Sequence, residues 1–326
     1  MSPRALSTAL GVLAVALVGC RGDDSTDTAP APSSAESAAK AEDFPKGASV
    51  SFADLQSRYP AQLSLGIGAS VMRQGVNRVP FVVLDKGARP ITNADVALYT
   101  VKTDGSDVRG PFSAQQTPFD LSPKYTSETT AGDTTSAKSF YAAEVPFQGK
   151  PPIGVFALVR IDGRLVAASP APLGVRGAHG GNPPDVGDEA VSVHTQTVRD
   201  VKDVSELTTR EPPNTAMLKD DFADVLGRKP VVIVFATPAL CQSRVCGPTV
   251  DVAEQVRAEV GNKVSFVHQE VYRDNEVNKG LRPQLVRWRL ASEPWIFVIG
   301  ADGRIAARFE GAVSVPELRA AVEKTI

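Results

Sequence analysis

The sequence of 326 residues lacks the usual marks of a nucleic-acid, metal or membrane-spanning protein. Basic and acidic residues nearly balance, at 35 and 37, and no block of like charges points to a polyanion partner such as nucleic acid. The three histidines, His179, His194 and His268, are isolated and have no metal-site spacing. No stretch reaches the roughly 18 apolar residues that a transmembrane helix needs. The three cysteines are therefore the main chemical signal.

The N-terminus has the layout of an export signal. Arg4 precedes an apolar run over residues 9–18, which is too short to span a membrane. The run ends in "LVGC", which resembles the lipobox of bacterial lipoproteins. The resemblance implies that residues 1–19 are a signal peptide and that Cys20 is lipidated as the first mature residue. An ordinary cleaved signal with an incidental cysteine is the alternative.

These features predict where the protein is located. We expect it in the cell envelope, anchored through lipid on Cys20 to the extracytoplasmic side of a bacterial membrane. Residues 20–48 are rich in Ala, Ser, Thr, Pro, Asp and Glu and contain one aromatic residue, Phe44. Such a segment buries too little apolar surface to fold, so we predict a disordered tether there.

Residues 50–175 show short alternating segments separated by turn signals, at 78–85, 94–101, 139–145 and 154–161. This pattern predicts an antiparallel immunoglobulin-like β-sandwich. The domain loosely resembles small sandwich domains of bacterial envelope proteins, some of them linked to copper handling, although it carries no residues suited to a metal. Its ligand is not indicated. The polar segment 109–137 is predicted to be a long exposed loop.

A glycine- and proline-rich stretch then marks a linker and lead-in, residues 176–229, with a short helix near residues 220–226. From residue 230 the pattern becomes α/β. Predicted strands cover 231–236, 264–271, 295–300 and 305–310, with helices at 249–260 and 281–290 and a final helix that begins at a capping box formed by Ser314 and Glu317.

This order of elements is the core order of the thioredoxin fold, and three local segments strengthen the resemblance: "VVIVFATPALCQSRVCGP", "ASEPWIFVIGADGRI" and "EGAVSVPEL". The predicted fold class is therefore two domains, an all-β immunoglobulin-like sandwich and an α/β thioredoxin-like domain at 230–326. The resemblance implies that Pro294 is a cis-proline before the third strand and holds a substrate strand. Glu293, which precedes it, would lie close enough to affect proton transfer.

Cys241 and Cys246 are separated by four residues, where thioredoxin-like proteins usually have two. Positions five apart on a helix point about 140° away from each other, so both cysteines cannot lie on one helix and still bond. We expect Cys241 in the loop and Cys246 at the helix start, followed by Gly247 and Pro248. The helix dipole, with Arg244, favours Cys246 as the reactive thiolate, whereas family analogy favours Cys241. Both assignments stay open here.

The leading functional hypothesis is a thiol–disulfide oxidoreductase that needs no cofactor and acts on an exported thiol- or disulfide-containing partner. A binding module with a structural disulfide is the first alternative. A copper-handling role is the second, because cytochrome oxidase assembly factors also have two cysteines followed by "PT"; they add a histidine before the third strand, where this chain reads "LASEPW". Peroxidases of this fold place threonine three residues before the reactive cysteine, whereas Thr237 is four before Cys241.

Overall fold

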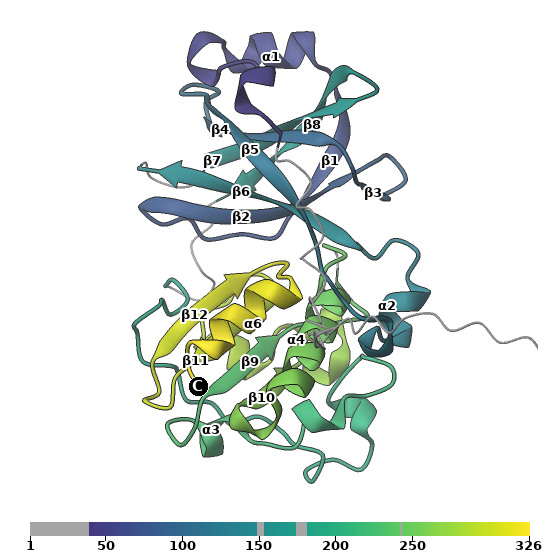
Figure 1. Cartoon of the computed structure of the whole chain (residues 1–326), viewed down its shortest axis with the longest axis vertical. Coiled ribbons are helices and arrows are strands. Elements are labelled where there is room, and N and C mark those ends of the chain that lie inside the picture. The colour runs from purple at the N-terminus through teal and green to yellow at the C-terminus, as the bar shows by residue number, and fades with distance from the viewer. Residues whose placement is uncertain (1–38, 149–152, 174–180, 242) are drawn as a thin grey trace, which may run out of the picture. The chain divides into compact units, whose positions relative to one another are not determined.

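The structure is a computed structural model that describes residues 39–148, 153–173, 181–241 and 243–326 (Figure 1). All of these belong to one unit, Glu36–Ile326. The predicted signal peptide, Cys20 and its proposed lipid, and most of the predicted tether lie outside the described residues. No helix in the described part of the chain has the length and apolarity needed to cross a membrane.

The last part of the predicted tether, residues 39–48, is folded. Two 3-10 helices, η1 (Ala41–Asp43) and η2 (Gly47–Ser49), flank Phe44, which is only 4% exposed. Phe44 packs in a core cluster with Tyr99 and Phe156. The apolar ring that seemed isolated in sequence therefore belongs to the folded unit.

The N-terminal half is a single eight-stranded sheet, ordered β1-β8-β7-β4-β5-β6-β2-β3, and β1 also pairs with β2. This extra pairing closes seven strands into a barrel, with β3 added on β2. The β1–β8 pair is parallel and the β1–β2 pair is antiparallel, so the sheet is mixed. The elements are α1 (Phe52–Arg58), β1 (Ala61–Ile67), β2 (Gly75–Leu84), β3 (Pro90–Ile91), β4 (Asp95–Lys102), β5 (Arg109–Pro118), η3 (Pro123–Tyr125), α2 (Glu128–Gly132), β6 (Ser139–Phe147), β7 (Ile153–Ile161) and β8 (Arg164–Leu173).

The predicted immunoglobulin-like sandwich is wrong, because a sandwich has two separate sheets and this sheet closes on itself. Alternation along a strand shows which side chains face inward but not which strands become neighbours. In β2, Val79, Phe81 and Val83 point into the barrel core, while Val82 packs into a different cluster. The same alternation fits either architecture.

The prediction of a long loop at 109–137 is also wrong for residues 109–118. Residues 109–118 form β5, which pairs with β4 on one side and with β6 on the other. Its sequence, "RGPFSAQQTP", is polar and includes a cis peptide bond at Gly110–Pro111. The polar residues and the proline suggested a loop, because β5 owes its strand structure to two neighbours and not to its own apolar pattern.

The C-terminal half has a four-stranded sheet ordered β10-β9-β11-β12, in which β9 and β10 are parallel and β11 and β12 are antiparallel to their neighbours. The predicted succession of strand, helix, strand, helix, hairpin and helix is confirmed. The elements are η5 (Val204–Glu206), η6 (Thr215–Met217), α3 (Phe222–Val225), β9 (Val231–Phe235), α4 (Cys246–Val260), η7 (Gly261–Lys263), β10 (Ser265–Gln269), η8 (Arg273–Asn275), η9 (Val277–Lys279), α5 (Pro283–Arg287), β11 (Trp295–Ile299), β12 (Ile305–Glu310) and α6 (Val315–Glu323).

The predicted α/β class nevertheless overstates the helix content. In this half only α4 and α6 are longer than five residues, and the predicted helix at 281–290 shortens to α5. The strand β9 is buried along its whole length. Val232 and Val234 pack in the cluster that includes residues of α4 and α6, whereas Ile233 packs on the other side with Trp288. This central strand leads directly into the cysteine loop.

Candidate functional site

The two cysteines lie at the end of β9, one in the loop and the other at the first residue of α4. They form a disulfide with a Cα–Cα distance of 5.9 Å. Arg244, between them, has a φ of 65°, a left-handed conformation that turns the chain from the loop into the helix. The predicted division between loop and helix start is therefore confirmed, and it brings Cys241 and Cys246 within bonding distance.

The two sulfur atoms have different surroundings. Cys246 is completely buried, whereas Cys241 is partly exposed. The backbone N–H of Cys246 donates a hydrogen bond to the Sγ of Cys241 at 3.3 Å, and the Ser243 hydroxyl lies 3.2 Å from the same Sγ. An N–H at a helix N-terminus stabilises negative charge, so this contact favours a thiolate on Cys241 once the bond is reduced.

Arg244 makes contacts that the sequence did not indicate. Its guanidinium pairs with Asp133 at 3.8 Å, and its carbonyl accepts a hydrogen bond from the Ala137 N–H at 3.0 Å. Both partners come from the segment between β5 and β6. Within the described contacts, Arg244 therefore anchors that segment to the cysteine loop.

The peptide bond between Glu293 and Pro294 is cis, as predicted. Trp295 pairs with Phe235, so the register places Pro294 beside Ala236, where β9 gives way to the cysteine loop. Pro294 is buried, and its carbonyl accepts a hydrogen bond from the Gly311 N–H at 2.8 Å. The structure thus places Pro294 at the same end of the sheet as the cysteine pair.

Glu293 belongs to a small group of polar residues at this end of the sheet. Burial raises the pKa of the Glu293 carboxyl, with a further rise from nearby Glu270, while a hydrogen bond with Tyr272 opposes the shift. Burial, together with Glu293, also raises the pKa of Tyr272. These shifts favour a protonated Glu293 over a wider pH range than an exposed carboxyl would show.

Sequence reasoning missed the connection between this group and the lead-in. The Glu270 carboxylate accepts hydrogen bonds from the N–H and hydroxyl of Thr209, both at 2.7 Å. The Thr209 hydroxyl in turn accepts one from the Ala239 N–H at 3.1 Å, within the cysteine loop. The available signal was the carboxylate of Glu270 directly after the buried strand β10, since such a position calls for a hydrogen-bond partner.

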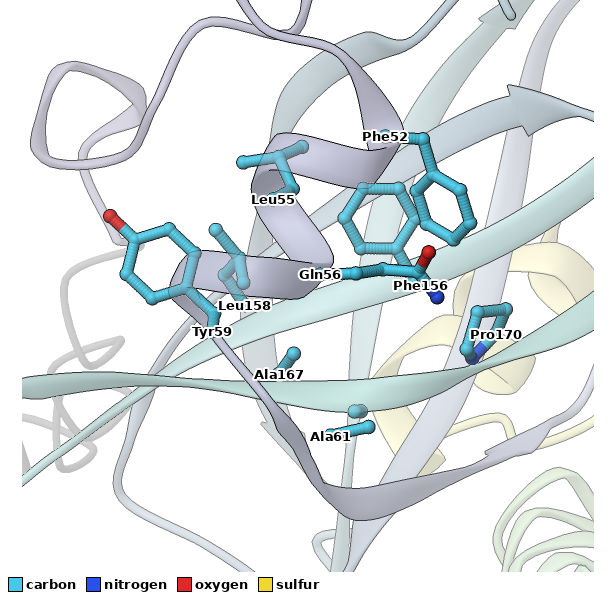
Figure 2. A pocket seen from close by; sticks show the side chains of 10 residues that line it. Phe52, Leu55, Gln56, Tyr59, Ala61, Phe156, Leu158, Ala167 and Pro170 are labelled. Atoms are coloured by element: carbon cyan, nitrogen blue, oxygen red, sulfur yellow. The ribbon is translucent and has the colours of Figure 1, made fainter. Parts of the chain in front are cut away.

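A separate cavity lies in the barrel half, between α1 and strands β1, β7 and β8 (Figure 2). Its volume is about 140 Å³, and its lining is mostly apolar, with Phe52, Tyr59 and Phe156 as the aromatic members. Its lining includes no residue of the cysteine loop. Among the described residues, no group of three or more His, Cys, Asp or Glu side chains is arranged to hold a metal ion.

Comparison with known protein families and with curated proteins gives no match. Among solved structures, the chain is similar to a thiol:disulfide interchange protein, a thioredoxin family protein from Chlorobium tepidum TLS. The sequence identity is 18% and the TM-score is 0.31, and the match covers 44% of this chain and 98% of the other. The four-stranded sheet and the disulfide after β9 are compatible with the thioredoxin-like arrangement expected from the sequence.

Proposed function

We propose that the protein is an extracytoplasmic thiol–disulfide oxidoreductase that uses Cys241 and Cys246 as its redox pair. The observation that carries this proposal is the asymmetry of the pair, with Cys241 partly exposed and Cys246 buried at a helix start. Exchange chemistry needs one sulfur open to a partner and a second held close to resolve the intermediate.

In the reducing direction, the Cys241 thiolate attacks one sulfur of a partner disulfide. A mixed disulfide forms, and the partner's other sulfur leaves as a thiolate that takes up a proton. Cys246 then loses its proton and attacks the Sγ of Cys241, which releases the partner's second thiolate and forms the internal disulfide. Two electrons pass from the cysteine pair to the partner, and the reverse sequence oxidises a partner dithiol.

We assign Glu293 to proton transfer and Pro294 to the shaping of the substrate site. A carboxyl with a raised pKa can accept and return a proton nearer to neutral pH than an ordinary glutamate. Glu293 lies at the same end of the sheet as the cysteine pair, and Cys246 must lose its proton there before it attacks. This reaction needs no cofactor, and its partner is an exported thiol- or disulfide-containing protein.

The proposal includes membrane attachment through lipid on Cys20 after removal of residues 1–19. The sequence "LVGC" at the end of the apolar run supports it. Mass spectrometry of the mature protein from its native membrane should find an acylated Cys20 at the N-terminus. A mature chain that begins elsewhere without lipid would refute the anchor and leave the redox proposal standing.

Trapping of mixed disulfides tests the redox function. The Cys246→Ser variant should accumulate a covalent complex with a disulfide-bonded protein, because Cys241 attacks and no second thiol resolves the complex. The Cys241→Ser variant should trap none, since Cys246 is buried. If only Cys241→Ser traps a partner, Cys246 is the attacking thiol. If neither variant traps a partner, the proposed redox function is wrong.

A structural disulfide is the second candidate, and the complete burial of Cys246 favours it. In that case the bond would fasten the cysteine loop to α4 in a binding module. Both single variants would then fail to trap a partner, and neither thiol of the reduced protein would have a pKa below the ordinary cysteine value of about 8.5.

A further inference from the structure

The segment that connects β5 to β6, residues 119–138, forms most of the wall of a groove that also touches the start of α4. Figure 1 shows β5 running out of the barrel toward α2, which lies beside α4. The groove has a volume of about 720 Å³ and includes Pro248 of α4 in its lining. This volume falls within the range of roughly 300 to 1,000 Å³ that is usual for ligand sites.

The groove begins where the cysteine loop ends. Asp133 and Ala137, both in its lining, contact Arg244 through the ion pair and hydrogen bond described above. Thr130, another lining residue, packs against Gly247 so closely that a β-carbon there would lie 2.8 Å from the threonine Oγ1. The groove therefore flanks the residues on both sides of Cys246.

The wall is held in place by buried contacts and does not depend on a ligand to order it. The N–H and hydroxyl of Ser127 donate to the Asp251 carboxylate of α4 at 2.9 and 3.0 Å. The Ser122 N–H donates to the Gln255 side chain at 2.8 Å, one helical turn further on. A preformed groove lowers the entropic cost of binding.

The barrel also lies close to the cysteine loop. A β-carbon on Gly66 of β1 would lie 3.8 Å from the Ser243 carbonyl oxygen. The hydroxyl groups of Ser70 and Ser292 lie 3.1 Å apart, which brings the β1–β2 connection onto the residues before buried Pro294. The barrel thus occupies part of the surroundings of the cysteine loop, and the groove is a cavity whose lining residues Asp133 and Ala137 contact that loop.

We propose that this groove binds an extended polypeptide segment of the partner protein, with an apolar side chain next to the cysteine that reacts. This inference rests on the proposed redox function and specifies its substrate class. Phe119 and Ala137 supply an apolar base, each only 2% exposed. Asp120 and Lys138 are exposed at the groove, and neither makes an ion pair within the described part of the chain. An apolar base with a few charged groups suits a peptide better than a bare small disulfide.

The test compares two substrates and two variants of the reduced full-length protein. The substrates are oxidised glutathione and a disulfide-linked peptide of about ten residues with leucine on both sides of its cysteine, a length that extends well past the reacting sulfur. Ala131→Trp introduces a large side chain at an exposed lining position. Gln115→Trp is the control, because Gln115 is exposed on β5 outside the lining.

We expect the Ala131→Trp variant to lower kcat/KM for the peptide by about tenfold, mainly through KM, and to leave the reaction with glutathione unchanged. The control should match the wild type with both substrates. An unchanged peptide reaction in Ala131→Trp, or an equal loss with both substrates, overturns the groove as a peptide site while the redox function stands. If the wild type reacts with neither substrate, the proposed redox function is wrong, and the inference about the groove falls as well.

Discussion

At the scale of single residues, the buried pair of Arg210 and Asp251 joins three parts of the chain. The Nε of Arg210 donates to the Asp251 carboxylate at 2.9 Å, and the exposed fractions of the two side chains are 8% and 0%. Arg210 also donates to the Tyr125 carbonyl at 3.1 Å. The lead-in, α4 and the groove wall are thus connected through one guanidinium.

The Asp251→Asn substitution tests that connection. The change leaves the guanidinium of Arg210 buried without its counter-charge, so the free energy of unfolding should fall by about 3 to 5 kcal/mol. Urea unfolding measures the difference. The Glu259→Gln control breaks a more exposed pair with Arg319 and should cost less than about 1 kcal/mol. An equal effect of the two substitutions would show that the buried pair has no special role.

His268 predicts a dependence of stability on pH. Burial lowers its pKa below 6.5, with Glu270 and the Ala236 carbonyl acting in the opposite direction and Arg210 and Arg282 lowering it further. Below pH 6.5 this imidazole is therefore protonated in the unfolded chain but stays neutral in the folded protein until the pH falls to its lowered pKa. The free energy of unfolding should fall as the pH drops from about 7 to 5.

The His268→Gln variant should lose part of this slope in urea unfolding at several pH values. His194→Gln provides a control of opposite sign, because a hydrogen bond with Asp221 raises the pKa of His194. Its stabilising effect is present below pH 6.5 and is lost as the pH rises through the raised pKa. Identical pH profiles for wild type and His268→Gln would contradict the assignment of a neutral buried histidine.

At the scale of elements, α6 shows what local sequence signals specify. The capping box predicted from Ser314 and Glu317 is present, with hydrogen bonds in both directions. Ser314→Ala should lower the free energy of unfolding by about 1 kcal/mol, because the Glu317 N–H loses its acceptor. Ser314→Asp keeps an acceptor and should retain most of the stability in the same chemical denaturation. An unchanged free energy of unfolding in Ser314→Ala would show that the cap contributes little here.

Local signals also identified the buried run of β9 and the division of the cysteines between loop and helix, and the family resemblance supplied the cis-proline position. The barrel was not identified in the same way, because its closure depends on pairing of β1 with both β2 and β8 across long stretches of sequence. The polar strand β5 and the groove wall at 119–138 were missed for the same reason. Their structure comes from neighbours that the local sequence does not reveal.

At the scale of the whole molecule, the disulfide closes a very short loop in a unit with several large apolar cores. Such a loop removes little entropy from the unfolded chain, so reduction should cost only about 2 kcal/mol of stability. The reduced protein should keep its circular dichroism spectrum and unfold cooperatively at a slightly lower urea concentration. Unfolding on reduction alone would mark the disulfide as essential to the fold.

The reduction potential of the Cys241–Cys246 pair tests the proposed redox function most directly. Equilibration of the folded protein with dithiol buffers of graded potential, followed by thiol alkylation and mass spectrometry, gives its value. A working exchange pair should have a potential above about −300 mV, so that cellular dithiols can reduce it. A potential below about −300 mV would identify a structural disulfide and contradict the oxidoreductase account.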